Sequence, residues 1–253
     1  MCLILFALQQ HPEYPLIVIA NRDEYYLRPT QAPHFWPEAP EIFAGKDLQA
    51  GGTWMGITRQ GRFAAVTNYR DNLDAPDNAI SRGDLCKNFL NSDISAEQFL
   101  AQIDQQKHRY AGFNLLVGDS QQLFYYSNKQ GEIISVPAGV HGLSNGLLND
   151  PWPKVETGKL ALADALKAGL SSPALMSVLL DSRSYPDDQL PRTGIELEKE
   201  RLLSSRFICS EDYGTRNATV LLSNPQHSQY LVKEFYSEGK AGEQRLTEII
   251  HQT

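Results

Sequence analysis

Apolar runs that end abruptly in polar residues are the most regular pattern in this sequence. Residues 2–8 and 15–20 are nearly continuous apolar runs, as expected for strands buried on both faces. The second run is followed directly by four polar residues, Asn21, Arg22, Asp23 and Glu24. Polar groups at the end of a buried strand are costly to desolvate unless they pair with one another or contact a ligand. The pattern predicts either a satisfied Arg–carboxylate pair or a functional site at this strand end.

The same pattern predicts further strands and hairpins. A turn at Gly61 joins expected strands at 53–58 and 62–69, and the second of these ends in polar residues from Thr67 to Arg70. Residues 141–145 form another polar strand end. The remaining expected strands are 113–117, 123–126, 132–136, 206–209, 218–223 and 229–235.

Helical periodicity appears in four segments. Ser95 begins a capping box with Gln98, and an apolar stripe through Phe99 and Ile103 follows it. Further helices are expected over 154–170, 173–181 and 196–203. Three loops are expected: the Pro-rich stretch that contains His34, Phe35 and Trp36, the polar segment 71–84, and residues 182–194.

The order of these elements predicts an α+β fold in which helices cover antiparallel sheets, because adjacent hairpins are frequent and strand–helix alternation is not. The chain has 253 residues, of which 42% are hydrophobic, and no break in composition divides it. We therefore expect one domain over residues 1–253.

Charge limits the classes of binding partner, and cysteine content and hydropathy indicate the cellular compartment. The net charge of −7 argues against a general nucleic-acid binder and against simple electrostatic docking to anionic membranes. Three cysteines without paired spacing are typical of a reducing compartment. The N-terminal run lacks a basic leader, and no stretch reaches the roughly 20 apolar residues of a membrane-spanning helix. We expect a cytoplasmic protein without an integral membrane segment.

Cys2 is the sharpest chemical candidate. If the first two strands pair as a hairpin, its thiol lies beside Arg22 and Asp23. Removal of the initiator methionine is expected before a residue as small as Cys, and it would leave a thiol and a free α-amine on one residue. The amine has a reference pKa of about 8 and is able to act as base for the thiol. The alternative interpretation is a small buried hydrophobe that begins a strand.

Other polar strand ends supply possible partners. Asn68 and Asn145 carry amides suited to an oxyanion. Arg216 follows a tight Gly-Thr connection and is a candidate for binding a carboxylate or phosphate, for supporting the Cys2 thiolate, or for a structural pair with Asp212 or Asp23. The candidate ligand-binding set comprises Asn21, Glu24, Trp54, Tyr69 and Trp152.

The histidines give no metal-site pattern. None of the six lies in an HxxxH or HxxE motif, and CxxC is absent, so a structural zinc site is not expected. A haem needs only one or two axial ligands. By residue type His34, His141, Met55 and Cys2 are all possible, and the sequence does not choose among them.

Several motifs together resemble one family. The Asn-Arg-Asp-Glu stretch at 21–24 resembles the signature of the NRDE family, also called the transport-and-Golgi-organisation family. The other similar motifs are the initial Met-Cys, Arg28-Pro29, GGTWMG at 51–56, TNY at 67–69, GFN at 112–114, GLSN at 142–145, PWPK at 151–154 and YGTR at 213–216. They occur in order over nearly the whole chain, so the resemblance is specific.

The resemblance implies a fold and a set of roles. The family is grouped with the N-terminal-nucleophile hydrolases, whose fold is a four-layer αββα sandwich of two antiparallel sheets. By similarity to the cysteine acylases of that group, catalytic roles would belong to Cys2, Arg22, Asp23, Asn68, Asn145 and Arg216. The order Asn21-Arg22-Asp23 differs from the typical acylase order and matches Asp23 better than Arg22.

Three hypotheses for the function remain open: a binding protein, an enzyme and a scaffold. The resemblance implies a soluble protein that binds and traffics haem, or a similar amphipathic metabolite such as acyl-CoA, with haem as cargo and no cofactor required. The residues themselves favour a Cys2-dependent amidohydrolase or thioesterase. The third hypothesis is a scaffold with a vestigial site, in which substitutions at 21–24 change only stability.

Overall fold

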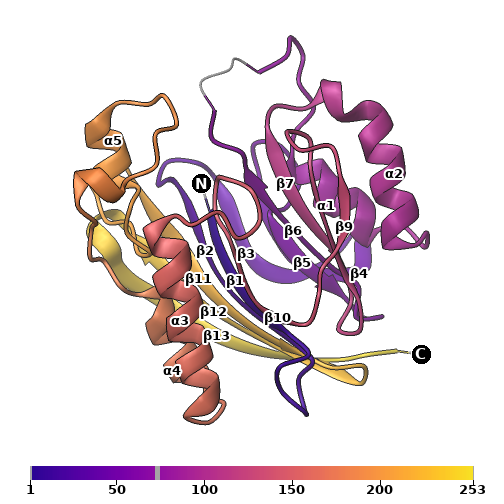
Figure 1. Cartoon of the computed structure of the whole chain (residues 1–253). Helices are drawn as coiled ribbons and strands as arrows, with labels where there is room; N and C mark the ends of the chain where they lie inside the picture. Colours follow the sequence, from indigo (N-terminus) through magenta and orange to yellow (C-terminus); the bar gives the residue numbers. More distant parts are fainter. Residues whose placement is uncertain (1, 72–74, 253) are drawn as a thin grey trace.

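Two antiparallel β-sheets face each other through the centre of the molecule (Figure 1). The computed structural model describes residues 2–71 and 75–252. The first sheet has the strand order β10-β1-β2-β11-β12-β13, and the second runs from β3 to β9 in chain order. Strands that follow one another along the chain pair antiparallel throughout the second sheet, which accounts for the hairpin pattern of the sequence; β6 and β7 alone among these described neighbours are joined by a helical segment.

The first sheet contains β1 (Cys2–Leu8), β2 (Leu16–Tyr25), β10 (Gly139–Leu143), β11 (Tyr213–Ser223), β12 (His227–Tyr236) and β13 (Lys240–Ile250). The second contains β3 (Thr30–Trp36), β4 (Ala39–Asp47), β5 (Met55–Thr58), β6 (Phe63–Asn68), β7 (Phe113–Gly118), β8 (Leu123–Ser127) and β9 (Ile133–Ser135). The α-helices are α1 (Gly83–Leu90), α2 (Ala96–Gln106), α3 (Pro153–Lys167), α4 (Ser172–Leu179) and α5 (Leu197–Leu202).

Burial on both faces explains the continuous apolar run in β1. Ile4 and Phe6 pack in the layer between the two sheets. The intervening residues Leu3 and Leu5 pack on the other face, in a cluster with Leu162 of α3. Because successive side chains of a strand point to opposite faces, a strand covered on both sides shows no alternation.

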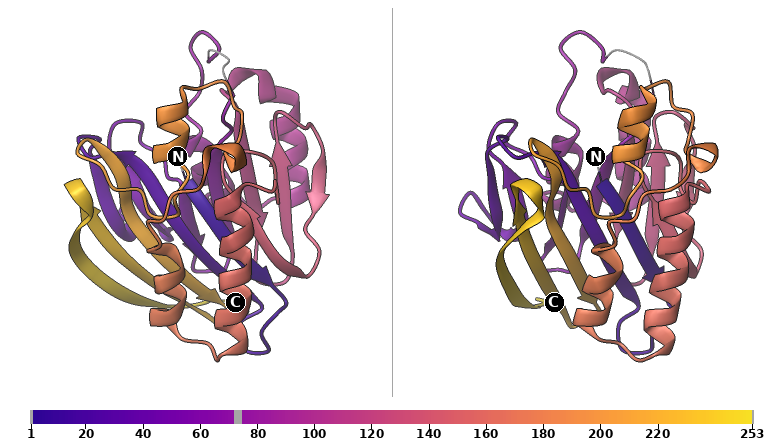
Figure 2. Two further views of the ribbon diagram at one scale, coloured as in Figure 1. Left: turned by 60° about the vertical axis from the view of Figure 1, so that its left-hand side comes forward. Right: turned by 90° about the vertical axis from the view of Figure 1, so that its left-hand side faces the viewer.

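The outer face of the second sheet is covered in the same way. Phe89 of α1 and Phe99 of α2 pack with Val66 and Leu115 of the sheet. Figure 2 shows α3 and α4 along the outer face of the first sheet, opposite α1 and α2. The molecule is thus a helix–sheet–sheet–helix sandwich, which confirms the α+β expectation of two antiparallel sheets between helical layers.

The Pro-rich stretch around His34, Phe35 and Trp36 is a strand, and the prediction of a loop there was wrong. It forms β3 at the edge of the second sheet, where a proline removes no ladder bond that the core requires. The pairing of β3 with β4 is interrupted between Gln31 and His34, next to Pro33. Trp36 is buried, and its indole Nε1 donates to the carbonyl of Ala44 at 3.0 Å.

Three other expectations need correction. Residues 206–209 form no strand, because Ile208 instead bonds the backbone and hydroxyl of Thr215. The expected loop 71–84 ends earlier, since α1 begins at Gly83, and its residues 72–74 lie outside the described part of the chain. Strand β13 was not predicted; most of its side chains are exposed and charged or polar, so it lacks the apolar alternation that marks a strand.

Candidate functional site

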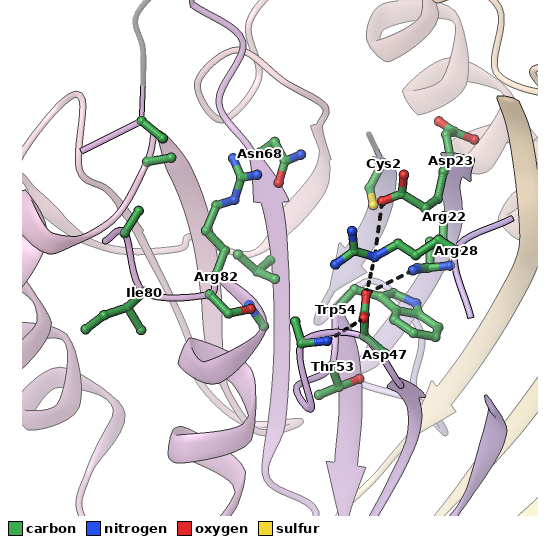
Figure 3. A pocket seen from close by; sticks show the side chains of 18 residues that line it. Cys2, Arg22, Asp23, Arg28, Asp47, Thr53, Trp54, Asn68, Ile80 and Arg82 are labelled. Atoms are coloured by element: carbon green, nitrogen blue, oxygen red, sulfur yellow. Dashed lines mark hydrogen bonds and ion pairs between the residues drawn. The ribbon is translucent and has the colours of Figure 1, made fainter. Parts of the chain in front are cut away.

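The polar ends of two of the apolar strand runs, at residues 22–24 and at Asn68, line a cleft of about 390 Å³. Its walls include the start of β1, the end of β2 and the end of β6. We call it the Cys2 cleft; Figure 3 shows its lining. The polar, charged and aromatic residues of the lining include Cys2, Arg22, Asp23, Arg28, Asp47, Trp54, Asn68 and Arg82.

Strand register places Cys2 directly opposite Arg22. Both belong to the face that continues into Ile4 and Ala20 between the sheets, so the thiol and the guanidinium enter the same cleft. The Arg22 guanidinium lies 4.2 Å from the ring centroid of Trp54 and pairs with Asp47 at 3.4 Å. The hairpin expectation is confirmed for Cys2 and Arg22.

Asp23 lies beside Cys2 through its backbone, while its carboxylate is turned away from the Arg22 guanidinium (Figure 3). Strand alternation directs its carboxylate toward the helical layer, where Thr215 Oγ1 donates to Asp23 Oδ1 at 2.7 Å. Burial raises the pKa of Asp23. The expectation that thiol, arginine and aspartate side chains share one face is therefore wrong for the aspartate.

A buried lysine lies behind Asp23. Lys154, near the start of α3, is buried, and its Nζ donates to the carbonyl of Leu203 at 2.8 Å. Burial lowers the pKa of Lys154 to about 8, although the negative charge of Asp23 acts in the opposite direction. The space between the first sheet and α3 thus contains ionisable side chains next to the cleft, as well as apolar ones.

The two asparagines have different roles. Asn68 lines the cleft, whereas Asn145 is fully buried and its Nδ2 donates to the carbonyl of Asn68 at 2.8 Å. The side chain of Asn145 thus holds the end of β6 in place. Ser144, which the sequence did not single out, donates its hydroxyl to the carbonyl of Cys2 at 3.2 Å.

Arg216 is not among the residues that line the cleft. Its Nη1 donates to the carbonyls of Tyr25 and Arg28 at 3.0 and 2.9 Å, so it fixes the turn after β2. The expected pair with Asp212 or Asp23 is not among the ion pairs of the described residues. A structural role is observed, through backbone carbonyls instead of a carboxylate.

The candidate ligand-binding set divides between three places. Glu24 and Trp54 line the Cys2 cleft. Tyr69 and Trp152 line a separate depression of about 530 Å³ next to Arg70. Asn21 faces the helical layer, where its Nδ2 donates to the carbonyls of Leu179 and Arg206 at 2.9 and 2.7 Å.

Three cleft residues were missed by sequence reasoning: Arg28, Asp47 and Arg82. Asp47 accepts from Arg28 Nε at 2.6 Å as well as from Arg22, so one carboxylate orients two guanidinium groups. Arg28 was visible only as part of the Arg-Pro motif. Arg82 lies in a polar segment without periodicity, and nothing in the sequence marks it.

The histidines considered as haem ligands do not reach the cleft. His34 Nδ1 bonds the carbonyl of Ala32, and both ring nitrogens of His141 have protein partners. Cys2 is the candidate axial ligand that lines the cleft.

Residues 2–71 and 75–252 contain no group of three or more His, Cys, Asp or Glu side chains placed to hold a metal ion. Within these same ranges, no helix has the length and apolar character needed to cross a bilayer.

Alkylation should report the state of the Cys2 thiol. Burial raises its pKa, and the positive charge of Arg22 and a hydrogen bond from the Asp23 backbone only partly oppose this effect. The thiol is protonated below its pKa, so iodoacetamide labelling is expected to be slow at pH 7 and to rise about tenfold per pH unit up to the pKa. Peptide mass spectrometry would measure it. Exposed Cys209 is the comparison site; equal labelling of both at pH 7 would contradict the raised pKa.

Comparisons with known proteins agree with the motif pattern. The profile of the family described as Transport and Golgi organisation 2 matches residues 1–237. The chain is 38% identical over 245 residues to the Transport and Golgi organization protein 2 homolog of Bos taurus, covering 88% of each chain. Among solved structures, it is similar to a mutant of the conjugated bile acid hydrolase from Clostridium perfringens, with a TM-score of 0.49 and 9% identity over 99% of this chain and 92% of that chain. It is also similar to the Caenorhabditis elegans ortholog of N-acylethanolamine-hydrolyzing acid amidase, with a TM-score of 0.47 and 10% identity over 87% and 92% of the two chains.

Proposed function

The chain belongs to the Transport and Golgi organisation 2 family, and from the geometry of its cleft we propose that it is a Cys2-dependent hydrolase of small compounds with an amide or thioester bond. The observation that carries the proposal is the position of Cys2. It begins β1, and its thiol lies in an open cleft directly opposite Arg22. A thiol at the second position becomes an N-terminal nucleophile once Met1 has been removed.

The raised pKa of the thiol, caused by burial, makes a base necessary, since little thiolate is present at neutral pH. The α-amine of processed Cys2 is that base. It takes the thiol proton, and the sulfur attacks the acyl carbon to form a C–S bond. The leaving amine or thiol departs with the proton returned by the ammonium group. Water then cleaves the thioester, which releases the carboxylic acid and restores the thiol.

The surrounding residues support this chemistry by charge and hydrogen bonding. Arg22 is held by Asp47 and Trp54, so its positive charge is fixed next to the sulfur and favours the thiolate. Asn68 lines the cleft and carries an amide donor for the oxyanion of the tetrahedral intermediate. Asp23 is a positioning residue, since its backbone N–H faces the sulfur and its carboxylate is held by Thr215.

Trapping the acyl-enzyme tests the proposal. Processed protein, with loss of Met1 verified by intact mass, is mixed with p-nitrophenyl butyrate and quenched in acid. We expect a burst of p-nitrophenol and a butyryl adduct on residue 2. An adduct only on Cys209, or no adduct at all, would contradict a nucleophilic role for Cys2. The same measurement on protein that retains Met1 should give no burst.

A second candidate function is the binding and transfer of haem or acyl-CoA. One observation favours it: the cleft combines a thiol with arginines able to pair with propionate or phosphate groups. A haemin titration should then give a saturable Soret shift that is lost in Cys2→Ala. Absence of a saturable change would remove haem as the ligand.

A further inference from the structure

We propose that Arg28 and Arg82 form an anion subsite in the Cys2 cleft, which selects ligands whose phosphate or carboxylate group is attached to an apolar chain. The inference deepens the proposed function and rests on it for the identity of the reacting bond. The anionic group would lie between the two guanidinium groups, and the rest of the ligand would extend along the cleft toward Cys2.

The two arginines approach the cleft from different elements. Arg28 belongs to the turn after β2, and Arg82 directly precedes α1 on the side of the second sheet. Figure 3 shows both guanidinium groups extending into the same space, with Asn68 next to Arg82. Planar guanidinium groups bind phosphate and carboxylate oxygens with paired N–H donors, so two of them facing one space suit a single anion.

Both side chains have donors to spare. A guanidinium carries five N–H donors. Among the hydrogen bonds of the described residues, Arg28 uses its Nε toward Asp47, and Arg82 uses its Nη1 toward the carbonyl of Gly112 at 3.1 Å. The terminal nitrogens of Arg28 and the Nη2 of Arg82 therefore have capacity for ligand oxygens.

Charge also favours an anion at this position. Arg22 and Arg28 share the carboxylate of Asp47, and Arg28 lies 3.9 Å from Glu24. In residues 2–71 and 75–252 no carboxylate pairs with Arg82 within ion-pair distance, although the side chain is partly buried. Burial lowers the pKa of Arg82, which means that its cation is poorly solvated. The negative charge and hydrogen-bond acceptors of a bound anion would compensate for the water that the Arg82 cation has lost.

The backbone beneath each arginine is fixed before any ligand arrives. Gly52 packs against the residue after Arg82, since a Cβ on Gly52 would lie 2.5 Å from the carbonyl carbon of Gly83. The amide of Thr53 also donates to the Gly83 carbonyl at 3.2 Å. On the other side, Arg216 holds the carbonyl of Arg28. A site whose backbone is already ordered loses less entropy on binding.

The rest of the lining indicates the apolar part of the ligand. Trp54, Val66 and Ile80 line the same cleft, together with several alanines. A small inorganic anion would leave these surfaces exposed to water. The subsite therefore suits an amphipathic molecule, with its charge at the arginines and its chain against Trp54.

Calorimetric titration of the full chain with three six-carbon probes tests the inference: hexyl phosphate, hexanoate and hexan-1-ol. We expect both anions to bind at least about tenfold more tightly than the alcohol, since each charge-assisted hydrogen bond contributes measurable affinity. Arg28→Gln and Arg82→Gln should each weaken hexyl phosphate binding by about tenfold or more. Arg59→Gln is the matched control, because Arg59 stacks over Phe35 and is not among the cleft-lining residues.

Equal affinity for hexan-1-ol and hexyl phosphate would overturn the inference, as would an anion preference that survives both glutamine substitutions. Arg82→Lys, which keeps the charge, guards against a folding defect in Arg82→Gln and should retain part of the preference. None of the probes contains an amide or thioester, so failure of the acylation test would leave these results intact. Conversely, a chain that forms the acyl adduct but shows no anion preference would contradict only the subsite.

Discussion

Replacing Cys2 by alanine is expected to reduce turnover of amide, thioester and activated ester substrates by about a thousandfold or more, because losing a covalent nucleophile removes the whole two-step route. The effect should appear almost entirely in kcat, since the lining of the cleft that binds substrate is unchanged apart from one sulfur. Steady-state kinetics on processed protein would measure it, with intact mass confirming that Met1 has been removed.

Two controls make the Cys2 result specific. Cys209→Ala removes an exposed thiol and should leave turnover unchanged. Cys86 is buried, burial raises its pKa well above the usual value, and its sulfur faces the carbonyl of Trp54 at 3.7 Å. Its alkylation should remain negligible during the assay. Residual turnover in Cys2→Ala that matches the unmodified chain would refute the proposed mechanism and favour a binding function.

Replacing Glu200 by alanine is expected to destabilise the fold by about 3–5 kcal/mol, the range observed when one partner of a buried ion pair is removed. Glu200 of α5 pairs with Arg70 at 2.6 Å, and the two side chains are only 4% and 6% exposed. Arg70 also lies 4.8 Å from the ring centroid of Trp152. Without Glu200, the buried guanidinium of Arg70 loses a carboxylate that compensates its charge. Urea denaturation followed by fluorescence would measure the loss.

Asp164→Ala is the matched control for the buried pair. Asp164 pairs with Lys167 at 3.5 Å on the surface of α3, where both side chains are more than three-quarters exposed. Solvent screens such a pair, so its loss should change stability by less than about 1 kcal/mol. If Glu200→Ala were as mild as Asp164→Ala, the pair would contribute nothing specific to holding α5 against the end of β6.

The elements that the sequence predicts well are those whose pattern follows from burial on a definite face. The two apolar runs at the N-terminus became β1 and β2, and the capping box at Ser95 is present with both of its hydrogen bonds. Strands β3, β4 and β13 were missed. β3 and β13 are edge strands, so proline and exposed charge are tolerated in them and the apolar pattern is weak. β4 is an inner strand, but it is short of apolar residues, and only its middle part is buried.

For the candidate site as well, the sequence identifies residues on long buried strands and misses residues in irregular segments. Sequence reasoning found Cys2 and Arg22 because they lie at the ends of long buried strands that pair as a simple hairpin. It placed the Asp23 carboxylate on the same face as Arg22, although the two-residue period of a strand turns adjacent side chains to opposite faces. Arg82 could not have been found, since only folding brings the residue before α1 to face the turn after β2.

Strand β2 lies between β1 and β11, and its second edge is completed only by residues from Tyr213 onward. The hairpin of β1 and β2 is synthesised well before β11, so the largely buried β2 keeps one row of backbone groups without its strand partner until β11 has been made. Such high contact order slows folding, and an open apolar edge promotes association with other chains. We therefore expect C-terminal truncations that remove β11 to aggregate instead of yielding a smaller folded unit.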